Sequence, residues 1–315
     1  MSAECFQRED GDIHGLSQST VSRTVHKVLR EIARIRRNYI NFPVGGRLNA
    51  VKNGFFAVGG FPGVVGLIDG THVGIQSPGG DHAEIYRNRK GYMSINVQIT
   101  CDHELKITNI VSRWPGSTHD SRIFNSSSLC EQLPELADNG HLLGDQGYPC
   151  TVNLLTPLGN PVTEPQRRYN RAHRRTRNGI ERMFGQWKRR FPVLGSRLRF
   201  KPAKCCTTIV AAAVLHNFGK EQNEREFEPD LGGPGEVPAH VVDPVPPGDV
   251  HGMISINCLD DFINNTSTFN ILGILHRPSY QVSMIALLFA IGFVAAASAQ
   301  YCLRTSWSES SWRLH

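Results

Sequence analysis

Apolar runs rich in β-branched residues predict three successive β-strands in the first half of the chain. Residues 63–75 form such a run, and the segments MSINVQITC at 93–101 and KITNIVSRW at 106–114 follow it. Short apolar runs of this composition are typical of strands. A further strand is predicted at residues 141–148, HLLGDQGY. The glycine-rich stretch before the first strand is interpreted as a connection.

Helical spacing of apolar residues predicts helices on both sides of these strands. The first covers residues 15–39, where serine residues near the start can cap the helix. A second helix is predicted at 119–133, between the third and fourth strands. Residues 167–191 are strongly helical in composition, and a last helix is predicted at 203–221. The apolar side of this last helix carries Ile209, Ala212, Ala213 and His216.

The order of these elements indicates an α/β fold in which helices cover a sheet. We expect a helical N-terminal segment over residues 1–45 and the sheet domain over 60–222. Prolines and glycines crowd into residues 223–265, which are therefore expected to be a linker. The tail, 266–315, contains an uncharged stretch at 282–299 that reaches the lower limit for a membrane span. We expect a misannotated exon or read-through rather than a membrane anchor, with a buried helix as a third alternative.

The charge of the chain is distributed unevenly. The net charge of +6 over 315 residues is a mild excess, but between residues 167 and 204 fourteen lysines and arginines stand against one acid, Glu181. Such a block favours a polyanionic partner. The eight cysteines include no CxxC pair, and the polar first residues lack the apolar core of a signal peptide. Both observations argue for a reducing compartment, the cytosol or the nucleus.

Three carboxylates stand at positions where burying a charged side chain is costly unless it faces a cation, a hydrogen-bond donor or solvent. Asp69 ends an apolar strand, Asp145 repeats that arrangement in the fourth strand, and Glu181 lies on the 167–191 helix. If the two strands are neighbours, the three carboxylates form a cluster suited to Mg²⁺ or Mn²⁺, which prefer oxygen ligands. Two such ions can activate a water molecule and stabilise a leaving 3′-oxygen. The alternative is that both aspartates begin turns and that Glu181 pairs with neighbouring arginines.

Asp120, in WPGSTHDSRIF, is a fourth candidate metal ligand. It stands at a predicted helix start, where an aspartate can cap the helix instead. By strand order we prefer Asp145 as the second ligand, because it ends the strand expected beside that of Asp69. Asp120 is kept as a ligand or as a residue that supports one.

Six ordered segments resemble the successive blocks of the Harbinger (PIF/Harbinger) transposase-derived nucleases, which are DDE superfamily endonucleases. They are GLIDGTHVGI, YRNRKGYMSINVQITCDH, WPGSTHDSRIF, LLGDQGYP, YNRAHRRTRNGIERMFGQWKRRFPVL and AAVLHNF. The resemblance covers residues 63–220, and DDFINN at 260–265 also looks like the end of a family member, whereas residues 266–315 do not.

This resemblance implies a ribonuclease-H-like mixed sheet flanked by helices and a metal-dependent DNA endonuclease. Asp69, Asp145 and Glu181 stand at the positions of the family's acidic triad. It further implies a nuclear protein that acts on double-stranded DNA, with a Myb-like DNA-binding protein as partner. The alternative function is that of a catalytically inactive, domesticated transposase that serves as a DNA-binding or protein-interaction module.

The basic residues around Glu181 are interpreted as contacts to DNA phosphates beside the metal cluster. A run of charge is more usually a solvated face, but this run is one-sided and adjoins the proposed site. His119 and His173 are also possible phosphate donors, although each could be an ordinary surface histidine. The predicted phosphate contacts are Arg171, Arg174, Arg175, Arg177, Lys188, Arg189 and Arg190.

The segment GLSQSTVSRTVHKVLREI at residues 15–32 resembles the second half of a helix-turn-helix. Gln18 and Arg23 would lie early on its recognition helix and could reach base edges or phosphates. Family members usually carry more helical sequence before this point, so we expect a truncated gene model or an incomplete module. The alternative is an amphipathic helix that packs on the nuclease core.

Overall fold

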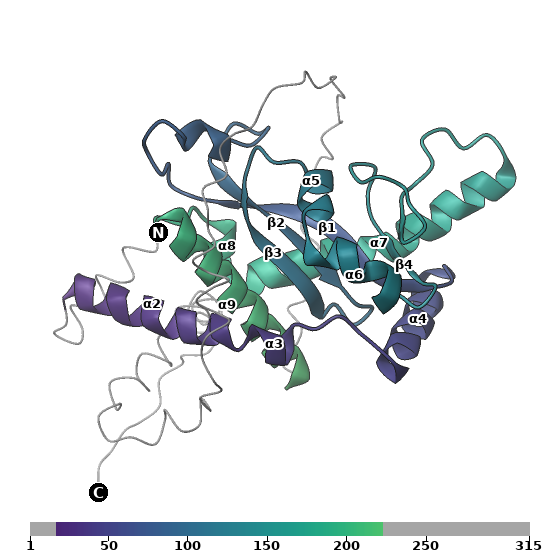
Figure 1. Ribbon diagram of the computed structural model, residues 1–315, viewed down its shortest axis with the longest axis horizontal. Helices are drawn as coiled ribbons and strands as arrows, with labels where there is room; N and C mark the ends of the chain where they lie inside the picture. Colours follow the sequence, from purple (N-terminus) through teal and green to yellow (C-terminus); the bar gives the residue numbers. More distant parts are fainter. Residues whose placement is uncertain (1–16, 223–315) are drawn as a thin grey trace, which may run out of the picture.

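A five-stranded sheet with the strand order β3-β2-β1-β4-β5 lies at the centre of the computed structural model, which describes residues 17–222 (Figure 1). Helices lie on both faces of this sheet, so the α/β class expected from the sequence is confirmed. The arrangement is consistent with the ribonuclease-H-like fold. The strands are β1 (Val64–Gly74), β2 (Ser94–Cys101), β3 (Ile107–Pro115), β4 (His141–Leu143) and β5 (Leu154–Leu155).

The central strand β1 has two different halves. It pairs with β2 in antiparallel fashion from Leu67 to Gly74, and β2 pairs in the same way with β3. On its other side β1 pairs with the parallel strand β4, and this pairing ends where Leu67 lies opposite Leu143. The second half of β1 therefore has a strand on one side only. That half carries the polar side chains of the strand, which are partly exposed.

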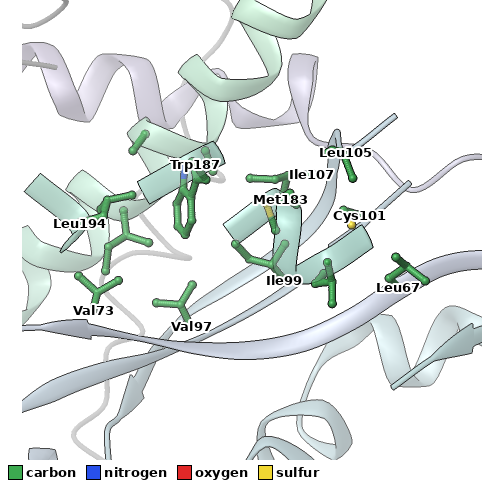
Figure 2. Packing of buried hydrophobic residues seen from close by; sticks show 14 of the residues in the cluster. Leu67, Val73, Val97, Ile99, Cys101, Leu105, Ile107, Met183, Trp187 and Leu194 are labelled. Carbon is green, nitrogen blue, oxygen red and sulfur yellow. The ribbon is translucent and has the colours of Figure 1, made fainter. Parts of the chain in front are cut away.

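One face of the sheet is covered by α7 (Glu164–Arg190), α8 (Pro192–Gly195) and α9 (Pro202–Glu221). Figure 2 shows Trp187 and Met183 of α7 packed over apolar side chains of β1 and β2. Trp187 is the largest of the fully buried side chains. Burial of such residues contributes roughly 1.5–3 kcal/mol for each large apolar side chain. This cluster fixes the position of α7 along β1.

Helix α7 has a well-defined start. The Thr163 hydroxyl accepts a hydrogen bond from the backbone of Gln166, and the Gln166 side chain accepts one from the backbone of Thr163. This capping box satisfies N–H groups that a helix start otherwise leaves unpaired. The buried residues of α7 recur at intervals of three and four, which places them on one stripe: His173, Thr176, Gly179, Ile180, Met183 and Trp187.

The opposite face of the sheet is covered by α5 (Asp120–Asn125) and α6 (Ser128–Leu136). The prediction of a single helix at 119–133 is wrong, because the helix is interrupted between Asn125 and Ser128. The Ser127 hydroxyl caps α6 by accepting from the backbone N–H of Cys130, so a new helix starts there.

Helix α4 (Gly46–Gly59) lies in the stretch that the sequence analysis interpreted as a connection, and that interpretation is wrong. Leu48, Val51 and Phe55 share one side of α4 and are buried in the core. Gly59 is required where α4 meets α7, because a side chain at this position would collide with the Thr176 hydroxyl.

The predicted helix at residues 15–39 is present as α2 (Gln18–Arg34) and the short α3 (Arg36–Tyr39). The buried side of α2, which includes Val25 and Leu29, packs against Ala211 and Val214 of α9. This contact corresponds to the alternative interpretation of the segment as a helix that packs on the core. The helix-turn-helix interpretation stays a prediction.

Two further differences concern the ends of elements. The fourth strand was predicted at 141–148 but ends at Leu143, because the chain turns between Asp145 and Tyr148. Helix α9 is buried on nearly all sides rather than on one, because both α2 and β3 pack against it. Among residues 17–222, none of the helices combines the length and apolar character of a membrane span. The predicted linker and tail at 223–315 lie outside the described residues.

Candidate active site

Asp69 and Asp145 lie beside each other where β4 ends. The parallel register pairs Leu67 with Leu143, and each aspartate stands two residues further along its segment. Asp69 does not end its strand as predicted, since β1 continues to Gly74, and Asp145 follows β4 rather than belonging to it. The sheet register, rather than two strand ends, brings the two carboxylates together.

The Asp69 carboxylate is largely buried, with 14% of its side chain exposed. Its Oδ2 accepts a hydrogen bond from Arg177 Nη2 at 2.6 Å, and its Oδ1 accepts one from the Gly70 backbone N–H at 2.8 Å. Burial raises the pKa of Asp69 to about 7; the Arg177 guanidinium opposes this rise, whereas the charges of Asp145 and Asp120 add to it. A buried carboxyl with such a pKa is typical of functional sites.

Asp120 reaches the same place from the opposite face of the sheet. Its Oδ1 accepts a hydrogen bond from Asn96 Nδ2 at 2.7 Å, and its carboxylate lies so close to Gly70 that no side chain fits at that position. Burial raises the pKa of Asp120, the Asn96 hydrogen bond lowers it, and the charge of Asp145 raises it. The cap residue of α5, His119, makes no capping side-chain hydrogen bond. Because the Asp120 carboxylate is bound by Asn96 and feels the charge of Asp145, it belongs to the aspartate group.

Asp145 is held by the turn that follows β4. Its Oδ1 accepts a hydrogen bond from the Gly147 backbone N–H at 2.9 Å. Burial raises the pKa of the Tyr148 hydroxyl well above its ordinary value, and the charges of Asp120, Asp69 and Asp145 all add to this rise. Three carboxylates from three separate segments therefore act on one another electrostatically.

Glu181 is placed differently from the aspartates. Its side chain is 61% exposed, and its Oε1 accepts a hydrogen bond from Arg177 Nη1 at 3.0 Å. Arg177 stands four residues earlier on α7 and donates to Asp69 with its other terminal nitrogen. The third predicted member of the triad thus meets Asp69 through an arginine. The alternative interpretation, in which Glu181 pairs with a neighbouring arginine, matches this contact.

Some of the predicted phosphate contacts gather on the site side of α7. Arg174, Arg177 and Lys188 recur on the helix face that also carries Glu181. Lys188 Nζ donates to Thr71 Oγ1 at 2.7 Å and to the His72 carbonyl at 3.2 Å. A cavity of about 360 Å³ opens beside Asp145, and Arg174 and Arg177 form part of its wall.

The other predicted phosphate contacts are not brought to the site. Arg171 pairs with Glu164 at 2.6 Å near the start of α7, and Arg190 donates to the carbonyl of His216 on α9. Arg175 and Arg189 are exposed on sides of α7 that face away from β1.

Two predicted contacts lie on α2. Arg23 hydrogen-bonds within its own helix, to Ser19 and Thr20, and Gln18 is exposed at the helix start. A role of these two residues in binding DNA stays a prediction.

The prediction that His173 lies on the surface is wrong, whereas its role as a phosphate donor stays a prediction, since the residue lines the cavity beside Asp145. It is 1% exposed, and its Nε2 lies 3.3 Å from the Leu155 carbonyl. Burial lowers the pKa of His173. The ring packs against Phe61 and Tyr169, so it is part of the core.

A second basic group, which was not predicted, lies beside the aspartates. Arg89 Nη2 lies 2.6 Å from the ring of His119, the residue before Asp120. Lys90, Lys188 and Arg89 all help to lower the pKa of His72 to about 4, after burial as the main cause. The signal was present in the letters RNRK at residues 87–90, but these charges are common in surface loops and did not stand out.

Comparisons with known proteins identify the family. The family model described as "DDE superfamily endonuclease" matches residues 68–217, which include all four candidate carboxylates. The chain is 35% identical over 238 residues to "Putative nuclease HARBI1" of Mus musculus and to the protein of that name in Homo sapiens, covering 74% of this chain and 68% of each relative. The Xenopus laevis protein of the same name is 30% identical over 223 residues, covering 69% and 64%.

The chain belongs to the Harbinger-derived DDE nucleases. The predicted resemblance is confirmed, and the chain is a member of a transposase-derived nuclease family. No solved structure gives a match to it. The assignment of particular carboxylates to catalytic positions therefore rests on the geometry of this chain.

The donor groups of this DDE nuclease fit a hard divalent cation, but they are not preassembled around one. Within residues 17–222, no group of three or more histidine, cysteine, aspartate or glutamate side chains is arranged as a metal site. The three aspartates nevertheless offer only oxygen atoms, and their charges converge, since Asp145 raises the pKa of both Asp69 and Asp120, and Asp120 also raises that of Asp69. Asp69, Asp145 and Asp120 are the residues that would hold the ion.

Proposed function

We propose that this chain hydrolyses phosphodiester bonds of double-stranded DNA with Mg²⁺ or Mn²⁺ as cofactor. The observation that carries this proposal is the convergence of Asp69, Asp120 and Asp145 at the half of β1 that has a strand on one side only, with basic side chains beside them. Clustering of carboxylates is unfavourable in a folded protein unless it serves a cation. The membership in a nuclease family supports the same conclusion.

Basic residues lie at two places around the site. Lys188 is anchored to Thr71, two residues after Asp69, and Arg174 lies on the wall of the cavity beside Asp145. Phosphates held at these two places would position a strand of DNA across the aspartates. Divalent cations bound by the aspartates would activate the attacking water and stabilise the leaving oxygen. The choice between Asp120 and Asp145 as the second ligand stays a prediction, as does the participation of Glu181.

The test is nicking of supercoiled plasmid by the full chain in Mg²⁺ or Mn²⁺. Cleavage is expected to require the metal and to be abolished in Asp69→Asn, Asp145→Asn and Glu181→Gln, whereas Asp120→Asn should weaken it without abolishing it, because Asp69 and Asp145 remain as ligands. Glu135→Gln removes an exposed carboxylate of α6 and serves as the matched control. Loss of activity in Asp120→Asn with retention in Asp145→Asn would exchange the roles of these two residues.

The inactive alternative makes a different prediction in the same experiment. A folded chain that binds duplex DNA in a salt-dependent manner but never cuts it would be a DNA-binding module. Because we also propose a Myb-like DNA-binding partner and a nuclear location, the plasmid assay includes a reaction with such a partner. Absence of cleavage both with and without the partner would overturn the enzymatic proposal.

A further inference from the structure

Arg177 occupies an unusual position for a DNA-binding residue. Its two terminal nitrogens donate to Asp69 at 2.6 Å and to Glu181 at 3.0 Å, and 18% of its side chain is exposed. Its third nitrogen, Nε, is buried and has no hydrogen-bond partner among the described residues. Both terminal nitrogens of Arg177 thus donate to carboxylates, while the Nε–H group has no acceptor among the described residues.

Arg177 supplies the positive charge that lies directly against Asp69. An arginine stays protonated at any ordinary pH, so it supplies a permanent positive charge. It lowers the pKa of Asp69 against the opposing effects of burial, Asp145 and Asp120. A divalent cation on the same carboxylates would repel the guanidinium and make it redundant.

A place for the displaced guanidinium adjoins the site. Arg177 already lines the cavity of about 360 Å³ beside Asp145, together with Arg174 one helical turn earlier. Asn170, another wall residue, is committed to the Leu158 backbone through bonds of 2.8 and 2.9 Å. The wall groups left for a ligand include the exposed Arg174 and Gln146, and two guanidinium groups on one wall favour a phosphate.

We propose that Arg177 is a built-in counter-ion that holds Asp69 and Glu181 in the metal-free protein and turns into the adjoining cavity when the aspartates bind a divalent cation. There Arg177 and Arg174 bind a phosphate of the DNA backbone. The protein then binds DNA tightly only when its metal site is filled. This inference rests on the proposed function, because it assumes a metal at the aspartates and DNA as ligand.

The first test measures metal affinity without any reaction. Calorimetric titration of the full chain with Mn²⁺ is expected to show about tenfold tighter binding in Arg177→Ala, a typical size for coupled equilibria, because no internal cation competes. Arg34→Ala removes a comparable arginine–glutamate pair on α2 and should leave Mn²⁺ affinity unchanged. Unchanged or weaker binding in Arg177→Ala overturns the proposal. If the alanine variant does not fold, Arg177→Lys, which keeps the charge, replaces it. The lysine variant should bind Mn²⁺ more tightly than the parent, with a smaller gain in affinity than that expected for Arg177→Ala.

The second test measures affinity for a fluorescent duplex in Ca²⁺ and in EDTA. Arg177→Ala should weaken binding about tenfold in Ca²⁺ and not in EDTA, whereas Arg174→Ala should weaken it in both. Equal losses in both conditions would make Arg177 an ordinary DNA contact and overturn the proposal. Inorganic phosphate is the comparison ligand, and equal binding of free phosphate and duplex at matched phosphate concentration would overturn the assignment of the cavity to DNA.

The plasmid assay separates this proposal from the function on which it rests. Cleavage together with unchanged Mn²⁺ affinity in Arg177→Ala rejects the counter-ion role alone. Tighter Mn²⁺ binding in that variant without cleavage by the parent chain rejects the nuclease activity and leaves the counter-ion role standing.

Discussion

The raised pKa of Asp69 makes the stability of the metal-free protein depend on pH. This pKa is about 7 in the folded chain, compared with an ordinary value of 3.8. Between these two values the folded protein keeps a proton that the unfolded chain has already released, so the free energy of unfolding falls as pH rises. The stabilisation is complete below the ordinary pKa and lost above the folded one. At about 1.36 kcal/mol per pH unit, the total loss is about 4 kcal/mol.

Asp69→Asn removes this titration and provides the perturbation. Urea unfolding in EDTA, at several pH values from about 5 to 8, gives the free energy of unfolding of the parent and the variant. We expect the parent to lose about 1.4 kcal/mol per pH unit relative to the variant up to about pH 7, and then to level off. Asp138→Asn replaces an exposed aspartate that pairs weakly with Lys52, and it should follow the parent.

Parallel curves for the parent and Asp69→Asn would contradict a raised pKa of Asp69, because they would mean that this carboxyl ionises as easily in the folded chain as in the unfolded one. Excess Mg²⁺ provides a second check. A cation that binds the ionised carboxylates should flatten the pH dependence of the parent chain. Mg²⁺ without effect would contradict the assignment of Asp69 to a metal site.

Three further predictions concern packing and charge. Trp187→Ala should lower the free energy of unfolding by about 3–5 kcal/mol in urea, because it empties the centre of the core; a loss below 1 kcal/mol would contradict that placement. Gly59→Ala should cost about 1–3 kcal/mol through its collision with Thr176, and Thr176→Ala should restore part of this in the double variant but not by itself stabilise the parent. Lys188→Met should weaken duplex binding and reduce the slope of log affinity against log salt by about 1, measured by fluorescence anisotropy, while Lys106→Met at the other end of the sheet leaves the slope unchanged.

The strands and long helices could be predicted because their signals are local. The apolar run of β1 and the capped, basic α7 both appear at nearly the predicted bounds. Helix α4 could not be predicted, because its glycines at positions 46, 54 and 59 argue against a helix. It forms because Leu48, Val51 and Phe55 bury one side against the core, and such tertiary burial outweighs weak helix propensity.

The surroundings of the site side chains could not be predicted for a similar reason. The sequence indicates that arginines flank Glu181, but which of them faces the aspartates depends on how α7 is rotated on the sheet. The burial of Trp187 and Met183 sets that rotation, and Arg177 then meets Asp69 while Arg175 faces solvent. His173 follows the same rule, since it falls on the buried stripe of α7 and reaches only the wall of the cavity beside Asp145.

The α/β class, the order of the main strands and the identity of the four candidate carboxylates could be read from the amino-acid sequence, because composition and spacing encode these features locally. Only the tertiary structure decided which carboxylates meet. The parallel register that aligns Leu67 with Leu143 brings Asp145 to Asp69, and an antiparallel neighbour contributes Asn96, which holds Asp120. These contacts join residues far apart in the chain, so they depend on the packing of the whole sheet and its helices rather than on any local pattern.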